Sequence, residues 1–86
     1  MLTSEDTEIA AWLRGLGRRV RLLRLMREMT QDELAAASGM SRSFISLIEH
    51  GTHGVDVVRL LRLAAALEVP LGELLGTTGP DRPPPG

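Results

Sequence analysis

The chain has 86 residues, which is enough for one small domain with a single modest core. It contains no cysteine, so a disulfide framework and a thiolate zinc site are excluded. No stretch approaches the roughly 20 apolar residues of a membrane span. The acidic character of residues 3–6 is unlike the basic start of a signal peptide. We therefore expect a cytoplasmic protein that has no membrane partner.

The charge distribution bears on whether the partner is a nucleic acid. Ten basic and eleven acidic residues give a formal net charge of −1, which is not typical of a DNA-binding protein. All ten basic residues are arginine, and six of them fall within residues 14–27. Residues 9–75 hold nine arginines against seven acidic residues, a net charge of +2. DNA binding is thus compatible with the sequence, but it would rely on shape fit and on a dimer.

The first helix is expected to span residues 5–27, with Ser4 as its N-cap. Apolar residues then recur at helical spacing, at Ile9, Leu13, Leu16, Val20 and Leu23. Gly15 and Gly17 each cost a helix about 1 kcal/mol relative to alanine, so they mark either a kink or a break. We therefore assign residues 1–15 as an N-terminal helical extension of a domain over residues 16–75.

Two short capped helices are expected next. Thr30 and Glu33 form a capping box that begins a helix over residues 31–37. A tight turn around Gly39 follows, and Ser41 caps a second helix that runs to about Glu49.

The chain then continues with a loop over residues 50–54 and a fourth helix capped by Asp56. That helix ends before Pro70, and a short fifth helix spans residues 71–75. The residues of the fourth helix that are expected to face inward are Leu60, Leu61, Leu63, Ala64 and Leu67. The Gly- and Pro-rich residues 76–86 are expected to be a disordered tail. No segment alternates with a period of two, so the predicted fold class is all-α.

The short pair of helices has the pattern of a helix-turn-helix unit. Ala35 is small where the two helices cross, and Gly39 suits a left-handed turn. Leu34, Met40, Ile45 and Ile48 would enter the shared core. The outer face of the second helix then carries Arg42, Ser43, Ser46 and Leu47. The alternative interpretation is two consecutive amphipathic helices in any small bundle.

Residues 16–75 resemble the Cro/repressor-type (XRE-type) helix-turn-helix family, which has a five-helix DNA-binding domain. The matching segments, in order, are residues 16–20 with 23–24, then 30–35, 41–51 and 63–75. The short loop after Gly51, together with residues 41–46, also resembles the controller proteins of restriction–modification systems, which are free-standing dimers. The resemblance implies a transcriptional regulator that binds double-stranded DNA as a homodimer.

The family pattern implies roles for individual residues of the second and third helices. Gln31 resembles a phosphate-contacting glutamine at a helix N-terminus. Arg42 either donates two hydrogen bonds to O6 and N7 of a guanine or contacts a phosphate without reading the base sequence. Ser43 matches a second base-reading position, and Ser46 lies one turn further along. Leu47 either contacts a thymine methyl group or is simply exposed.

Other positions imply backbone contacts or a structural role. Ser41, Thr52 and His53 are expected to contact phosphates, although Thr52 and His53 stand where relatives often have lysine or arginine. Arg24 and Glu49 match an ion pair of the family. That pair bridges the first helix to the end of the helix that reads DNA, which is the helix at residues 41–50 here. His50 and His53 lack a third ligand, so we expect no metal site and no cofactor.

A second apolar stripe does not fit a minimal domain. Leu22, Leu25 and Met26 lie largely opposite Val20, and Ile9 and Trp12 add further apolar surface. Either the N-terminal segment folds back onto this stripe, or the stripe is an interface.

Two functions remain open from the sequence. The first is a dimeric regulator that reads a pseudo-palindromic DNA site. The alternative is a protein-interaction module, such as an antirepressor, antitoxin or adaptor, that uses a surface of Trp12, Leu22 and Met26. An enzyme is not expected, because the sequence has no metal cluster, no Gly-rich phosphate loop and no spacing that would hold a nucleophile near a base.

Overall fold

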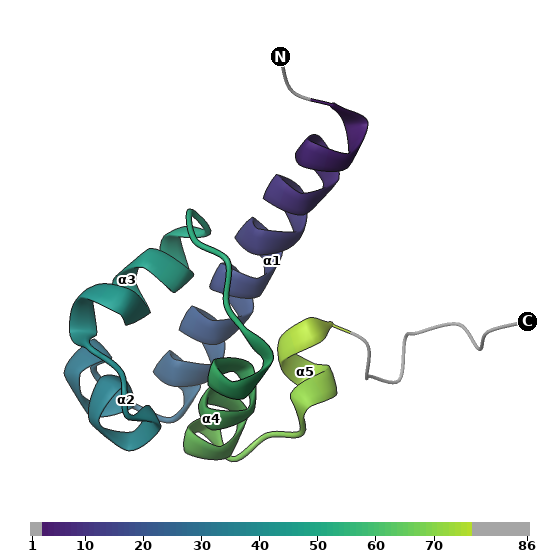
Figure 1. The fold of residues 1–86 in the computed structure, drawn as a ribbon. Helices are drawn as coiled ribbons and strands as arrows, with labels where there is room; N and C mark the ends of the chain where they lie inside the picture. The colour runs from purple at the N-terminus through teal and green to yellow at the C-terminus, as the bar shows by residue number, and fades with distance from the viewer. Residues whose placement is uncertain (1–2, 77–86) are drawn as a thin grey trace, which may run out of the picture.

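The computed structural model describes residues 3–76, which fold into five α-helices (Figure 1). No strand occurs within this described range, so the all-α five-helix prediction is confirmed. The expected tail lies outside the described residues, apart from Gly76 at the end of the last helix. The helices are α1 (Ser4–Met26), α2 (Gln31–Ser38), α3 (Arg42–His50), α4 (Val57–Leu67) and α5 (Leu71–Leu75).

The N-cap of α1 is Thr3, so the prediction of Ser4 is wrong by one residue. The Thr3 hydroxyl oxygen accepts a hydrogen bond from the Asp6 backbone N–H at 3.1 Å, and the Asp6 carboxylate accepts one from the Thr3 N–H at 3.1 Å. This reciprocal capping box needs a carboxylate three residues after the cap. From Ser4 that position is Thr7, which cannot supply one.

Helix α1 is continuous through Gly15 and Gly17, so a break there is wrong. Its N-terminal part projects beyond the other four helices (Figure 1). A Cβ atom on Gly17 would lie 2.4 Å from the Ile48 carbonyl oxygen and 2.6 Å from that of Glu49. Glycine at this position therefore lets the backbone of α3 approach α1. The cost in helix propensity is offset by this close contact between helices.

The predicted caps of the next three helices are confirmed. Thr30 and Glu33 form a capping box, with bonds of 2.8 and 3.0 Å, and Gly39 adopts a left-handed φ of 70° after α2. The Ser41 hydroxyl accepts a hydrogen bond from the Phe44 N–H at 3.1 Å. The Asp56 carboxylate accepts one from the Arg59 N–H at 2.9 Å. These local bonds set where α2, α3 and α4 begin.

The core is formed by apolar side chains from all five helices. Met40 is half-buried against it. Leu61 is 51% exposed, so its expected inward position is wrong. Leu60, Leu63, Ala64 and Leu67 follow the i, i+3, i+4, i+7 spacing of one face, and Leu61 lies about 100° round the helix from Leu60. The buried apolar side chains of this core are Leu16, Val20, Leu34, Ala35, Ile45, Ile48, Leu60, Leu63, Ala64, Leu67 and Leu74.

Candidate nucleic-acid interface

The outer face of α3 and the start of α2 enclose one shallow hollow of about 340 Å³. Ile45 and Ile48 are buried on the opposite side of α3, which fixes the side that faces outward. Five residues assigned to DNA from the sequence thus meet at one place. The residues that line the hollow are Gln31, Arg42, Ser43, Ser46 and Leu47.

Arg42 is the first residue of α3, and two-thirds of its side chain is exposed. Its Nε lies 3.9 Å from the Asp32 carboxylate, which is also exposed. An exposed pair at this separation contributes little free energy and competes with water. The guanidinium therefore keeps its N–H groups available for a ligand in the hollow.

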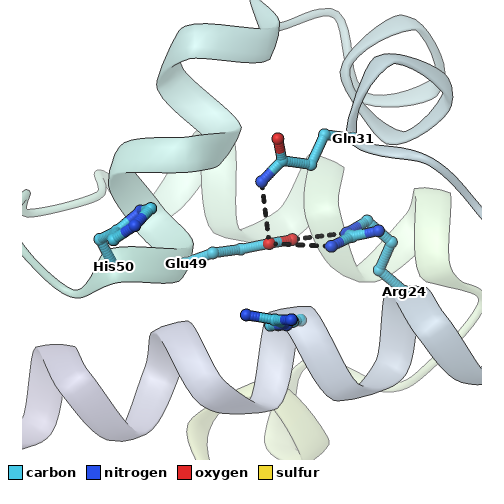
Figure 2. A pocket seen from close by; sticks show the side chains of 5 residues that line it. Arg24, Gln31, Glu49 and His50 are labelled. Carbon is cyan, nitrogen blue, oxygen red and sulfur yellow. Dashed lines mark hydrogen bonds and ion pairs between the residues drawn. The ribbon is translucent and has the colours of Figure 1, made fainter.

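Arg24 and Glu49 form a buried ion pair between α1 and the end of α3 (Figure 2). Arg24 Nε donates to Glu49 Oε2 at 2.7 Å, and Nη2 donates to Oε1 at 3.1 Å. Arg24 Nη1 also donates to the Met29 carbonyl oxygen at 2.8 Å. The hydrogen-bonded carboxylate raises the pKa of Arg24, so the guanidinium stays charged despite its burial.

Gln31 joins this pair, which the sequence analysis did not anticipate. Its Nε2 donates to Glu49 Oε1 at 3.1 Å, while its amide oxygen points away from the carboxylate (Figure 2). The start of α2, the end of α3 and the last turn of α1 are therefore held by one polar network. Among the described residues, no buried side-chain nitrogen or oxygen lacks a hydrogen-bond partner. A network satisfied in this way favours one orientation of α3.

Ser41, Thr52 and His53 do not line the α3 hollow. The Ser41 hydroxyl is engaged as the α3 cap, and Thr52 Oγ1 donates to the Leu47 carbonyl oxygen at 3.3 Å. The His53 ring lies edge-on to Phe44, with ring centroids 6.4 Å apart and an interplanar angle of 88°. Ser41 instead borders a separate hollow of about 320 Å³ beside Phe44.

The second apolar stripe of α1 is exposed. Met26 is 70% exposed and Leu22 is 58% exposed. Trp12, nearer the N-terminus of the same helix, is 44% exposed. Because α1 is one continuous helix, the N-terminal segment does not fold back onto the stripe, so that interpretation is wrong. Helix α4 has exposed apolar residues as well, at Val57, Val58 and Leu61.

In residues 3–76 no group of three His, Asp or Glu side chains is placed to hold a metal ion. No helix in this range is long and apolar enough to cross a membrane.

Comparison with known proteins identifies the family. The family described as Helix-turn-helix (HTH_3) matches residues 20–74, which is more than half of the chain. The chain belongs to this helix-turn-helix family. The resemblance to XRE-type regulators is thereby confirmed, and the fold is that of a DNA-binding transcriptional regulator.

Curated relatives of this helix-turn-helix protein are transcriptional regulators. SlrR of Bacillus subtilis (strain 168) is 42% identical over 60 residues, which cover 69% of this chain and 40% of SlrR. The repressor RghR of the same organism is 37% identical over 68 residues, which cover 78% of this chain and 50% of RghR. The chain therefore spans half or less of the length of these two relatives.

A solved structure supports the resemblance to restriction–modification controllers. The controller protein C.AhdI from Aeromonas hydrophila is 39% identical, with a TM-score of 0.73. The match covers 74% of this chain and 97% of C.AhdI. This helix-turn-helix protein is thus similar to the controller over nearly the whole length of the controller.

Sequence reasoning missed several residues at this helix-turn-helix surface. Arg21 and His50 line a hollow of about 190 Å³ together with the Arg24–Glu49–Gln31 network. In the sequence Arg21 is one of six arginines within residues 14–27, and its spacing of three from Arg24 is the signal that sets it apart.

A second missed group surrounds the start of α3. The Arg59 guanidinium lies over the Phe44 ring, 5.3 Å from its centroid, and joins Phe44 to the start of α4. The sequence did not indicate that these two side chains would meet, because they are 15 positions apart.

Proposed function

We propose that this chain is a sequence-specific DNA-binding transcriptional regulator that inserts α3 into the major groove and acts as a homodimer. The observation that carries the proposal is the hollow on the outer face of α3. It gathers one cationic, two hydroxyl and one apolar side chain from Arg42, Ser43, Ser46 and Leu47. This mixture matches the donors, acceptors and methyl groups that base pairs present in the major groove.

Base reading is proposed for the exposed side chains of α3. Arg42 would donate two hydrogen bonds to O6 and N7 of a guanine, because its guanidinium has only a weak partner in Asp32. Ser43 would donate to or accept from an adjacent base. Ser46 and Leu47 lie one turn further along, where Leu47 would contact a thymine methyl group.

Anchoring on the DNA backbone is proposed for the first turn of α2. Thr30 accepts hydrogen bonds from the Glu33 and Leu34 N–H groups. The N–H groups of Gln31 and Asp32 precede these and suit a phosphate at a helix N-terminus. Ser41, Thr52 and His53 are proposed as weaker contacts on the flanks.

A homodimer is proposed because a net charge of −1 gives one domain little electrostatic affinity for DNA. Two copies would place their recognition helices about one DNA turn apart, roughly 34 Å. The proposed contact is the exposed apolar side of α4 at Val57, Val58 and Leu61. It adjoins the loop after α3, so pairing there would bring the two copies of α3 near each other.

A gel shift with the 86-residue chain tests DNA binding directly. Binding to random and genomic duplexes at low salt, weakening as salt rises, is the expected result. Absence of binding at low salt would overturn the proposal.

The protein would act in the compartment that holds the DNA, expected to be the cytoplasm, and would need no catalysis or cofactor.

A protein-interaction module is the second candidate function. The observation in its favour is the exposure of Trp12, Leu22 and Met26 along α1. Failure to bind DNA, together with a partner whose binding is lost in Trp12→Ala, would favour this function over the first.

A further inference from the structure

The hollow beside the base-reading face has one side chain whose hydrogen-bond donors are all unused. It is lined by Arg21, Arg24, Gln31, Glu49 and His50 and measures about 190 Å³. Arg24 has committed its Nε, Nη1 and Nη2 to Glu49 and Met29. Arg21, in contrast, has neither a hydrogen bond nor an ion pair among residues 3–76, which leaves five N–H donors free.

The other lining residues offer less to an incoming group. His50 Nδ1 lies 2.7 Å from the Ser46 carbonyl oxygen, which only accepts, so Nδ1 carries a proton. Nδ1 of His50 is therefore already engaged within α3 and is not available to a ligand. Gln31 has used one amide N–H on Glu49 and retains the second.

The charge of the hollow favours an anion. Glu49 is the one carboxylate in its lining, and Arg24 neutralises it through two hydrogen bonds. The charge of Arg21 is then left without compensation. An uncompensated guanidinium beside a network already satisfied suits an oxyanion, which arginine binds with strong, charge-assisted hydrogen bonds.

The position of the hollow indicates which anion would reach it. Gln31 lines both this hollow and the hollow on the outer face of α3, so the two hollows adjoin. Ser46 of the base-reading hollow also accepts the hydrogen bond of His50 through its carbonyl group. A duplex seated against α3 would therefore bring a backbone phosphate over Arg21.

We propose that Arg21 binds a non-bridging oxygen of a DNA-backbone phosphodiester, with the second amide N–H of Gln31 as an additional donor. The inference rests on the proposed DNA-binding function and adds a residue to it. Arg21 would fix the position of the protein on the duplex and would read no base.

Salt-dependent DNA binding by the full chain tests this role. Fluorescence anisotropy with a selected operator and with a random duplex would compare wild type with Arg21→Gln. The slope of log affinity against log salt is negative, and it should become less negative by about 0.9, the value for one lost phosphate contact. Between 50 and 200 mM salt, that change alters the ratio of wild-type to variant affinity roughly three- to fourfold, on both duplexes.

Arg18→Gln is the matched control. Arg18 is exposed on the same helix, and its loss changes the net charge equally, but it does not line the hollow. It should keep the wild-type slope. Equal slopes for Arg21→Gln and wild type would overturn the Arg21 contact while DNA binding stands. Absence of DNA binding by wild type would overturn both proposals.

Neutral linkages in the DNA distinguish a backbone phosphate from a free one. Replacing one operator phosphate at a time by methylphosphonate should reveal one linkage that weakens wild type but not Arg21→Gln. If no such linkage exists and inorganic phosphate alone perturbs Arg21 at constant ionic strength, the hollow binds free phosphate and the proposal is overturned.

Discussion

The arginines of α1 lie on different sides of the helix and meet different parts of the molecule. Arg19 Nε donates to the Leu74 carbonyl oxygen at 2.5 Å and so ties α1 to the last turn of α5. Burial lowers the pKa of Arg19, and the neighbouring charge of Arg18 adds to this effect. Arg24 is buried against Glu49, and Arg27 pairs with Glu68 at the surface. Arginines that look alike in the composition thus have distinct structural partners in the fold.

Replacing Arg42 by alanine should weaken operator binding by about 1–3 kcal/mol and relax the preference at one base position. The reason is the loss of two hydrogen bonds to one guanine. Competition binding with operators altered at single base pairs would measure both effects. An equal loss of affinity on every sequence would assign Arg42 to a phosphate instead.

Replacing Glu49 by alanine should lower the free energy of unfolding by about 3–5 kcal/mol, because it leaves a buried guanidinium without its partner. The side chains of Arg24 and Glu49 are only 10% and 4% exposed. Denaturant unfolding would measure the change. Glu68→Ala is the control, since its pair with Arg27 is exposed and should contribute about 0–1 kcal/mol. Similar losses in both variants would contradict the structural role of the buried pair.

The elements of this fold are positioned by contacts between backbones as much as by side chains. Gly17 of α1 lies under the last carbonyl groups of α3, and Gly51 ends α3 with a φ of 73°. A Cβ atom on Gly51 would lie 2.7 Å from Arg14 Cα. Helix α3 is therefore set against α1 at two glycines, and its position depends on both.

Gly17→Ala should destabilise the protein by about 1–3 kcal/mol, because α1 and α3 must move apart to admit a methyl group. Thermal and denaturant unfolding would measure this. Gly15→Ala is the matched control, since its Cβ would meet no backbone atom but the guanidinium ends of Arg19, at 3.2 Å, and Arg18, at 3.9 Å. That variant should be neutral or gain up to about 1 kcal/mol of helix propensity. A Gly17→Ala protein as stable as wild type would show that the crossing tolerates the added group.

The helix caps make stability depend on pH. Hydrogen bonds with Thr30 lower the pKa of Glu33, and hydrogen bonds with Arg59 lower that of Asp56. Both carboxylates thus stabilise the folded state above their unfolded pKa values of about 4, and this contribution is lost as pH falls through the lower folded values.

Wild type should therefore exceed a Glu33→Gln/Asp56→Asn variant in stability at pH 7, and the difference should shrink toward pH 3. Urea unfolding midpoints across this range would measure it. Glu8→Gln, at an exposed residue that caps no helix, should follow wild type. A difference that does not change with pH would rule out the charged caps as its source.

Local signals in the sequence predicted most of the elements and the outward face of α3. Caps such as Ser41 and Asp56 act within four residues, and buried Ile45 and Ile48 fix the opposite face of α3 by helical spacing. The sequence did not reveal that Leu61 is exposed, because a run of apolar residues does not show which side chains pack against another helix.

Contacts between distant segments account for the rest of what the sequence did not reveal. The bond from Gln31 to Glu49 and the hollow at Arg21 require three helices to meet. The packing at Gly17 depends in the same way on where α3 crosses α1.

At the scale of the whole molecule, the proposed homodimer would form through the exposed apolar side of α4. Leu61→Asp should raise the dimer dissociation constant at least tenfold, since burying one leucine is worth about 1.5–3 kcal/mol. Light scattering over a concentration series would measure this. Leu25→Asp on α1, also half-exposed, is the control and should leave the dimer intact. The opposite pattern would place the dimer contact on α1.

Selection of bound sites from a random duplex pool by the full chain tests the central claim most directly. Recognition through two copies of α3 predicts an enriched pseudo-palindrome, with half-sites about 10–10.5 base pairs apart and a guanine in each. Enrichment of no sequence would contradict sequence-specific DNA binding by this protein, and enrichment of a single site without symmetry would contradict the dimer.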